Sequence, residues 1–368
     1  MNNKILSIHH LRGIAALIVV FFHFRGYLNG VYAQKDLGSM LFNSGSFGVD
    51  LFFMISGFII ALSTRNLTSK AIFAVRRFFR IYPAFIITFT LGALTVYRFD
   101  PSENIIRGML FIHRDYSVGS PGFGYNVLGP AWTLTYEIYF YSLFVLAMCF
   151  THRFRTILTS IFLLSPIVIL QLYYNGEISL AGTASANVPL DNPAFSILRF
   201  ISSPILAEFI VGMFFYELYS RVQFIIKRAF ALFIFFVCTG FFITYYSSGN
   251  LTGFGLDKSG LISAVLLFGF LTYDKSIGFN ENKTLNFLGD ISFSIYISHY
   301  VFINMLNYYK PDFYIHTVGW SRFFMMTTIT ITAGTILHFY IEKPFIAIGK
   351  KIEGIFSFRK HRKLETAE

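Results

Sequence analysis

Charged residues are scarce in this chain of 368 residues. Only 13% of them are Asp, Glu, Lys or Arg, whereas 55% are hydrophobic, and the mean hydropathy is +0.58. A soluble domain has about 25% charged residues, so this composition argues against an ordinary soluble protein. Long apolar runs recur along the whole length and leave no room for a separate soluble domain.

Cysteines and metal-binding motifs are also scarce. Cys149 and Cys238 both lie in apolar runs, which argues against a disulfide framework. No CxxC, HExxH or EF-hand pattern occurs, so we expect no metal cofactor. No basic stripe is interleaved with exposed aromatic residues, so the net charge of +11 does not indicate nucleic acid. That charge instead fits binding to anionic membrane lipids.

Runs of about 17–25 apolar residues predict an all-α, polytopic membrane protein with about ten transmembrane helices. With the N-terminus assigned to the cytoplasm, about two thirds of the 30 Lys and Arg residues fall on the cytoplasmic side. The positive-inside rule therefore predicts that both termini are cytoplasmic, N-in and C-in. We assign residues 1–346 to an integral membrane domain and residues 347–368 to a basic cytoplasmic tail. The predicted spans are 7–27, 46–64, 81–98, 131–150, 156–174, 196–218, 229–247, 259–274, 287–308 and 318–341.

The first predicted span contains two ionisable residues, Arg12 and His23. Ionisable groups inside a membrane are costly and usually functional. Eleven residues bring an α-helix to within about 20° of its starting direction, so both side chains face the same way, about 16 Å apart. Arg12 suits phosphate or carbonyl oxygens, whereas His23 can take a proton near neutral pH. The alternative interpretation is a snorkelling arginine with an interfacial histidine.

A basic segment leads into the third predicted span. Arg76 and Arg80 are four residues apart, so on a helix they share a face and can bind one phosphate group together. Arg77 is expected to turn away from them. With Arg12 at the same membrane face, the pair fits a donor with several phosphates, such as coenzyme A. The alternative is an ordinary positive-inside anchor.

Residues 129–141 combine a carboxylate with aromatic side chains. Glu137 lies about one turn inside a span, where a carboxylate needs a partner. His23 is expected at the matching depth, which predicts a carboxylate–imidazole dyad. The aromatic residues Trp132, Tyr136 and Tyr139 are also typical of an aromatic belt at the outer membrane interface.

Other polar residues lie at or inside the ends of the predicted spans. For Asp50, His299 and Glu342, a hydrogen bond within the helix bundle is the simpler interpretation. We regard His338 and Glu208 as structural. The residues that we assign to substrate binding are Trp132, Tyr136, Tyr141, Asp50 and His299.

Taken in order, six motifs resemble the acyltransferase-3 family of integral membrane O-acyltransferases. They are LRGIAALIVVFFHF, FGVDLFFMISGF, RRFFRIYP, PAWTLTYEIYFY, ISFSIYISHY and IEKPF. The resemblance runs from about residue 8 to residue 346, which is nearly the whole chain. Many family members append a soluble hydrolase-like domain, and this chain resembles the stand-alone members.

Each family motif assigns site residues to matching positions in this sequence. The family's pattern of a basic residue, ten others and a His falls on Arg12 and His23. Its tryptophan–glutamate segment falls on Trp132 and Glu137, but Ile138 occupies the position where the family commonly has a second acidic residue. Its Arg-x-x-x-Arg pattern falls on Arg76 and Arg80.

The resemblance implies transfer of an acyl group, most often acetyl, from cytoplasmic acetyl-CoA or another acyl-CoA across a bacterial inner membrane. The acceptor is a hydroxyl of a polysaccharide or lipid-linked glycan, such as O-antigen or exopolysaccharide. His23 either deprotonates this hydroxyl or carries the acyl group, and Glu137 is the second catalytic residue. Arg12 and the Arg-x-x-x-Arg pair bind the CoA. The alternatives are a transporter or flippase, which the lack of an internal inverted repeat disfavours, and a non-catalytic sensor.

Overall fold

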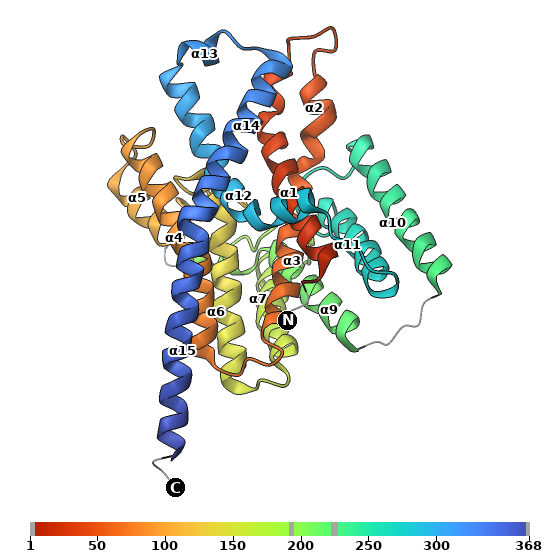
Figure 1. The fold of residues 1–368 in the computed structure, drawn as a ribbon, viewed down its shortest axis with the longest axis vertical. Helices are drawn as coiled ribbons and strands as arrows, with labels where there is room; N and C mark the ends of the chain where they lie inside the picture. The colour runs from red at the N-terminus through yellow and green to blue at the C-terminus, as the bar shows by residue number, and fades with distance from the viewer. Residues whose placement is uncertain (1–3, 191–194, 222–226, 366–368) are drawn as a thin grey trace.

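The computed structural model describes residues 4–190, 195–221 and 227–365, with residues 355–365 as backbone only. The described part is helical, which confirms the predicted all-α class, and its one β-bridge joins Ala181 to Gly255. Figure 1 shows α15 extending beyond the other helices, with the C-terminus at its far end. The α-helices are α1 (Leu6–Phe24), α2 (Leu37–Phe42), α3 (Phe47–Ser63), α4 (Lys70–Leu94), α5 (Ser102–Met109), α6 (Trp132–Phe150), α7 (Arg155–Asn175), α8 (Ile197–Ile201), α9 (Ala207–Arg221), α10 (Arg228–Ser248), α11 (Ser259–Ser276), α12 (Lys283–Tyr309), α13 (Asp312–Ile315), α14 (Gly319–Leu337) and α15 (Lys343–Glu365).

Six segments of the described chain are long and apolar enough to cross a membrane, so the protein is a multi-pass membrane protein. Of the other four predicted spans, three fall on α4, α11 and α12, and the fourth is divided between α8 and α9. The predicted domain boundary between residues 346 and 347 falls inside α15. The six segments are Leu6–Tyr27, Leu37–Ser63, Gly129–Phe150, Arg155–Asn175, Arg228–Ser248 and Gly319–Gly354.

Two predicted spans differ from the helices that form. Residues 81–98 overlap only the second half of α4, which begins at Lys70 because the Ser69 side chain caps it by accepting the Ile72 N–H at 3.4 Å. The basic segment is therefore part of the same helix. Predicted span 196–218 is broken between α8 and α9, where Pro204 lacks the N–H that a continuous helix needs.

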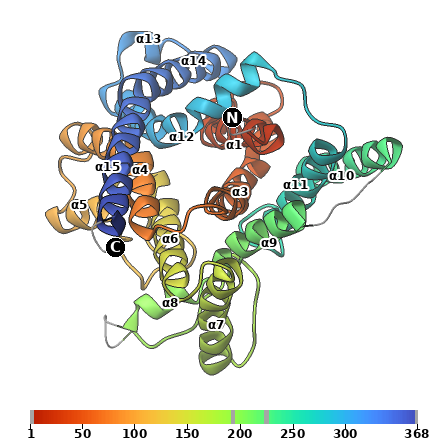
Figure 2. The ribbon, with the colours of Figure 1, turned by 60° about the horizontal axis from the view of Figure 1, so that its bottom comes forward.

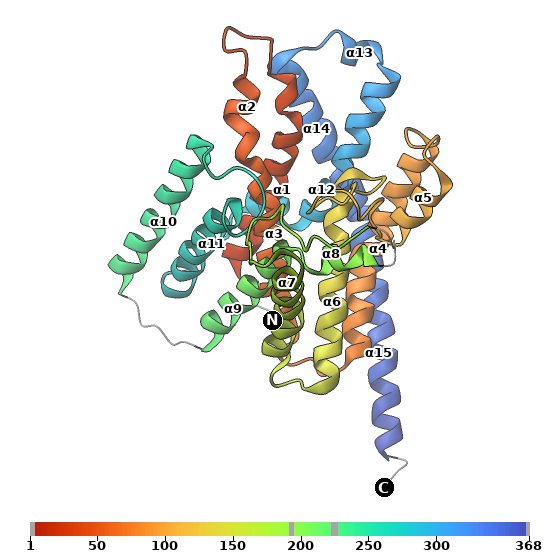
Figure 3. The same cartoon turned by 180° about the vertical axis from the view of Figure 1, so that it is seen from behind.

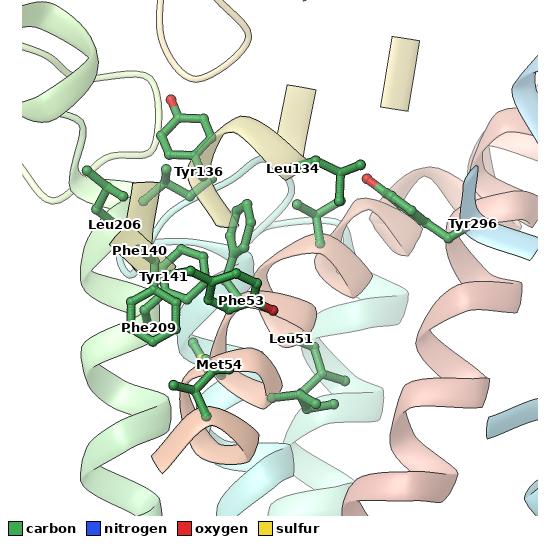
Figure 4. Packing of buried hydrophobic residues seen from close by; sticks show 14 of the residues in the cluster. Leu51, Phe53, Met54, Leu134, Tyr136, Phe140, Tyr141, Leu206, Phe209 and Tyr296 are labelled. Carbon is green, nitrogen blue, oxygen red and sulfur yellow. The ribbon is translucent and has the colours of Figure 1, made fainter. Parts of the chain in front are cut away.

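Helices α3, α6 and α9 pack together through aromatic rings in the core (Figure 4). The Phe209 ring of α9 lies 4.8 Å from the Phe53 ring of α3 and 4.4 Å from the Phe140 ring of α6, centroid to centroid. Within a membrane such packing is driven by van der Waals contact rather than by exclusion of water. This cluster holds α3 and α6 as two walls of the site described below.

Helix α1 lies between α12 and α3, and α15 runs alongside α4 (Figures 2 and 3). The α1–α12 contact is close because glycines face each other. A Cβ on Gly289 would lie 2.5 Å from the carbonyl oxygen of His9, and one on Gly13 would lie 2.7 Å from the Gly289 nitrogen. Small residues allow helix backbones to approach in this way. Side chains of α1 are thereby placed directly against α12.

Candidate active site

Arg12 and His23 both contact α12, as their spacing on one helix face predicts. Arg12 Nε donates to Ser292 Oγ at 2.9 Å, and its Nη2 donates to the Gly289 carbonyl oxygen. Nearer the C-terminal end of α1, the His23 ring lies 5.1 Å from the His299 ring, centroid to centroid. The two helices therefore hold the cation and the imidazole at two different levels of the bundle.

A pocket of about 650 Å³, called here the inner pocket, lies beside Arg12 among α1, α3, α4 and α15. Arg76 binds Glu353 through two hydrogen bonds, one of them 2.9 Å from Nε to Oε2. Cations outnumber carboxylates in this lining, which therefore suits an anionic ligand. The charged residues of the lining are Arg12, Arg76, Arg77, Arg80, Lys350 and Glu353.

The expectation that Arg77 turns away from Arg76 and Arg80 is wrong. All three side chains line the inner pocket, because at about 100° per residue Arg77 lies only about 60° around α4 from Arg80. Arg76 is paired with Glu353 and Arg80 with Glu342, whereas Arg77 Nε is buried with no hydrogen-bond partner in the described structure. Arg77 is thus the cation of this group best placed to bind a ligand.

Arg80 is held by a network at the one π-helical turn of the described chain, His338–Glu342. Its guanidinium is paired with Glu342, whose side chain is fully buried. Glu342 Oε2 also accepts from Ser294 Oγ at 2.7 Å and lies 2.9 Å from His338 Nδ1. The hydrogen bonds expected of Glu342 and His338 therefore exist, and they fix the position of an arginine in the pocket wall.

A smaller space of about 110 Å³, the middle cavity, continues from the inner pocket towards the centre of the bundle. Glu137 and Tyr141 of α6 line it, and Glu137 accepts hydrogen bonds from Tyr141 and, at 3.0 Å, from Ser56 Oγ. The middle cavity is therefore a mostly apolar space between helices, with Glu137, Ser56 and the arginines among its polar groups. The residues that line both spaces are Arg12, Ile59, Arg77 and Arg80.

The dyad predicted between Glu137 and His23 is not formed in this structure. Glu137 is bonded to Ser56 and Tyr141 in the middle cavity, whereas His23 contacts His299 and lines a different space. Among the described residues, no carboxylate forms an ion pair with His23. The two residues thus do not share the level that the sequence suggested, and the Glu137 side chain is directed towards Ser56 of α3.

The space that His23 lines is a pocket of about 590 Å³, called here the outer pocket. Asp100 and Arg114 form an ion pair of 2.9 Å in its wall, and Asn304 Nδ2 donates to the Tyr97 hydroxyl at 2.6 Å. Aromatic faces with a few oriented polar groups are typical of a site for a polar organic ligand. The polar and aromatic residues of the lining are Phe22, His23, Ser46, Tyr97, Asp100, Arg114, Tyr125, Asn126, Trp132, Phe254, Tyr296, Tyr300 and Asn304.

Tyr296 stands between the middle cavity and the outer pocket. It lines both spaces together with Val49. Its hydroxyl donates to the Pro130 carbonyl oxygen at 3.0 Å and lies 2.8 Å from Thr133 Oγ1. Inner pocket, middle cavity and outer pocket thus form a series along α1, with neighbouring spaces sharing wall residues.

The residues assigned to substrate binding occupy different places. Trp132 lines the outer pocket and Tyr141 the middle cavity, while His299 is fully buried beside His23. Asp50 is buried and accepts from the Gly255 N–H and from Ser259 Oγ, both at 2.8 Å, so it anchors the loop that brings Phe254 to the outer pocket. The remaining residue, Tyr136, donates to the carbonyl oxygen of Pro121 at 2.9 Å.

That Tyr136 bond anchors the loop between α5 and α6, which supplies much of the outer wall. His113 of this loop is fully buried against the rings of Tyr116, Phe123, Tyr136 and Phe200. Burial lowers the pKa of His113 to about 3, so its imidazole is neutral at physiological pH. The loop therefore has a small aromatic core of its own.

Sequence reasoning missed several wall residues. Lys350 belongs to α15, which was expected to be a tail rather than a wall of the inner pocket. Asp100 and Arg114 lie in a long polar loop, and only that polarity hinted at a role for them. No group of three or more His, Cys, Asp or Glu residues close enough to hold a metal ion occurs in the described part of the chain.

Comparison with known proteins identifies the family. A family model described as an acyltransferase domain matches residues 5–339. Among curated proteins, the exopolysaccharide production protein ExoZ of Rhizobium meliloti (strain 1021) is 23% identical over 320 residues, which are 84% of this chain and 92% of that protein. No solved structure matches the chain.

Two further relatives match over shorter regions. The acyltransferase MdmB of Streptomyces mycarofaciens is 29% identical over 154 residues, which are 39% of each chain. BcsY of Komagataeibacter xylinus, named as a membrane-bound transacylase, is 27% identical over 193 residues, which are 48% of this chain and 46% of that protein. This chain therefore spans less than half the length of MdmB and BcsY. Because the family model covers nearly the whole chain, the protein belongs to the acyltransferase-3 family, and its candidate spans make it a multi-pass membrane protein.

Proposed function

We propose that the protein transfers an acyl group, with acetyl as the simplest case, from cytoplasmic acyl-CoA to a hydroxyl of a cell-envelope or secreted polysaccharide. The observation that carries this proposal is the series of three spaces along α1, cationic at one end and containing His23 at the other. A donor with phosphates at one end and a thioester at the other matches that series in order. Acetyl-CoA is such a donor.

The donor would bind from the inner pocket. Its phosphates would meet Arg77, Arg80 and Lys350, with Arg76 reaching them by exchanging its contact with Glu353. The flexible arm would then pass Arg12 and enter the middle cavity beside Glu137. Glu137 offsets the positive charge of the neighbouring arginines, which keeps this passage from binding a second anion.

The chemistry would occur on the His23 side of Tyr296. In the direct route, the acceptor oxygen forms a bond to the acyl carbon, the carbon–sulfur bond breaks, and the hydroxyl proton passes to His23 and then to the CoA thiolate. In the second route, a His23 nitrogen bonds to the acyl carbon as the carbon–sulfur bond breaks and the thiol of CoA leaves. The acceptor oxygen then bonds to the acyl carbon, the acyl–nitrogen bond breaks, and the hydroxyl proton passes to the released His23 nitrogen. Both routes place the acceptor in the outer pocket, where aromatic faces and the Asp100–Arg114 pair are available to a sugar ring.

A polysaccharide acceptor is supported by the ExoZ relative, which is named for exopolysaccharide production and matches this chain over 92% of its length. O-antigen and lipid-linked glycans belong to the same chemical class. We also propose that ten helices cross the bacterial inner membrane with both termini in the cytoplasm. The excess of Lys and Arg on that side supports this topology, and the cationic inner pocket would then face the cytoplasmic pool of acyl-CoA.

The test compares surface or secreted glycan from cells with and without the gene by NMR and mass spectrometry. We expect an ester to be lost on deletion and restored by the wild-type gene but not by His23→Ala at equal membrane abundance. Identical ester content with and without the gene would overturn the proposed acceptor class.

A further inference from the structure

The His23 ring is held by packing alone in this structure. It contacts the rings of Phe22, His299 and Tyr300, with centroids 5.1, 5.1 and 5.3 Å away. No hydrogen bond to His23 occurs among the described residues. Arg25, the nearest cation along the chain, lies over the Phe22 ring and donates to the Phe22 carbonyl oxygen. A histidine that must present one particular nitrogen to a substrate needs a partner for the other.

His299, in contrast, has a buried acceptor nitrogen without a partner in the described part of the chain. It is fully buried, and its Nδ1 lies 2.7 Å from the carbonyl oxygen of Tyr296. A carbonyl oxygen only accepts hydrogen bonds, so Nδ1 carries the proton and neutral His299 has a lone pair on Nε2. Nε2 is buried and has no partner in the described structure. Buried polar atoms without a partner are rare in native proteins and call for an explanation.

We infer that His299 is a positioning residue for His23: His299 Nε2 accepts the N–H of one His23 ring nitrogen, which leaves the other nitrogen as a base facing the outer pocket. This inference rests on the proposed function of His23. The ring centroids are already 5.1 Å apart, so the bond needs only a reorientation of the His23 ring and does not depend on bound substrate.

His299 thus has the orienting role that the sequence suggested for the carboxylate Glu137. The Glu137 carboxylate is hydrogen-bonded to Ser56 and Tyr141, and Asp100 of the outer pocket is paired with Arg114. A neutral acceptor orients the imidazole without adding charge to the site. His299 is itself fixed by its Nδ1 bond to the carbonyl oxygen of Tyr296. Tyr296 also separates the middle cavity from the outer pocket, so one residue positions both His299 and the point where the thioester would enter.

Two variants of equal polarity separate this role from a purely structural one. In His299→Gln the amide reaches the position of Nε2 and can accept from His23, whereas in His299→Asn the shorter amide reaches only the position of Nδ1 and can still donate to Tyr296. We expect kcat to fall ten- to hundredfold in His299→Asn and clearly less in His299→Gln, with KM for acyl-CoA unchanged in both. Ser298→Ala is the matched control on the same helix, because Ser298 Oγ donates only to the Ser294 carbonyl oxygen.

The two variants and the wild type are also treated with diethyl pyrocarbonate at fixed pH, and modification of His23 is followed by mass spectrometry, with exposed His316 as the internal standard for reagent dose. We expect His23 to react several-fold more slowly in His299→Asn and near the wild-type rate in His299→Gln. This readout needs no substrate. Failure of the wild type to transfer any acyl group would therefore refute the proposed function while the reaction of His23 still tests the pairing.

Either of two results would overturn the inference. One is a kcat in His299→Asn equal to or above that of His299→Gln, since this would mean that the bond to Tyr296 is the one that matters. The other is a His23 modification rate that is unchanged or faster in His299→Asn, as expected if His299 only fills space.

Discussion

The inner and outer pockets lie along the same helix but are built from different kinds of structure. Every lining residue of the inner pocket belongs to a helix, and its charged residues are mostly cations. The outer pocket combines helix residues with loop residues such as Tyr97, Asp100 and Phe254, and aromatic rings dominate its wall. Loops tolerate sequence change better than helices and often carry specificity. The comparison suggests one site rigidly adapted to a fixed donor and another adaptable to different acceptors.

The largest expected effect is the loss of turnover in His23→Ala, which leaves donor binding intact. His23→Ala should lower kcat by about 10²–10⁴-fold, the usual contribution of a general base. Binding of acetyl-CoA, measured by calorimetry on detergent-solubilised protein, should not change, because His23 does not line the inner pocket. His10→Ala is the matched control, since His10 lies on the same helix and contacts the Asn286 side chain instead. A His23→Ala protein with near-normal turnover would remove His23 from the chemistry.

The next largest effect is on the affinity for acetyl-CoA and should differ between Arg77 and Arg76 of the inner pocket. Arg77→Ala should raise the Kd for acetyl-CoA more than Arg76→Ala does, because Arg77 is unpaired whereas Arg76 must first release Glu353. A hydrogen bond to a charged group contributes about 1.5–3 kcal/mol, which corresponds to roughly ten- to a hundredfold in Kd for Arg77. The KM for the glycan should stay constant in both variants. A larger loss in Arg76→Ala would restore the arginine pair expected from the sequence.

A smaller effect is expected in the outer pocket. Tyr125 is 54% exposed and lines this pocket. Tyr125→Ala should raise the KM for the glycan several-fold, since an aromatic contact adds about 0.5–1.5 kcal/mol, and should leave acetyl-CoA binding unchanged. Steady-state kinetics with each substrate varied in turn measures both quantities. A rise in the KM for acetyl-CoA instead would mean that the two pockets are not separate sites.

The smallest expected effect is on stability and concerns His113 in the loop between α5 and α6. His113 is neutral when folded, with its pKa lowered by burial to about 3, so the unfolded state binds more protons below pH 6.5 and stability falls as the pH falls. Between pH 7.5 and pH 5 this should cost about 2 kcal/mol of the unfolding free energy. In His113→Phe, the loss of thermal stability over that range should be visibly smaller. Equal losses in the two proteins would show that His113 is accessible to protons when folded.

The sequence predicted those features that depend on one helix alone. Arg12 and His23 face one way because their spacing is a property of α1, and both contact α12 as a result. Features that depend on how two helices are rotated against each other were not predictable. Glu137 lines the middle cavity and His23 the outer pocket, because packing of α6 against α3 and α9 sets the position of Glu137, and no local sequence pattern records that packing.

The errors over Arg77 and α15 have separate causes. Residues three apart on a helix are neighbours as well as residues four apart, so Arg77 lies close to Arg80 on α4 and lines the inner pocket with Arg76 and Arg80. The wall contributed by α15 was missed because its sequence is basic rather than apolar. Lys350 lies there beside the arginines of α4, where only tertiary packing could place it.

In the proposed mechanism, donor and acceptor reach one reaction centre from opposite sides of the membrane. The direct test uses sealed proteoliposomes containing the purified protein, with isotopically labelled acetyl-CoA on one side and the acceptor glycan only on the other. We predict that the glycan becomes labelled across the intact membrane and that His23→Ala proteoliposomes show no such transfer. Labelling that occurs only when both substrates are on the same side would contradict the account.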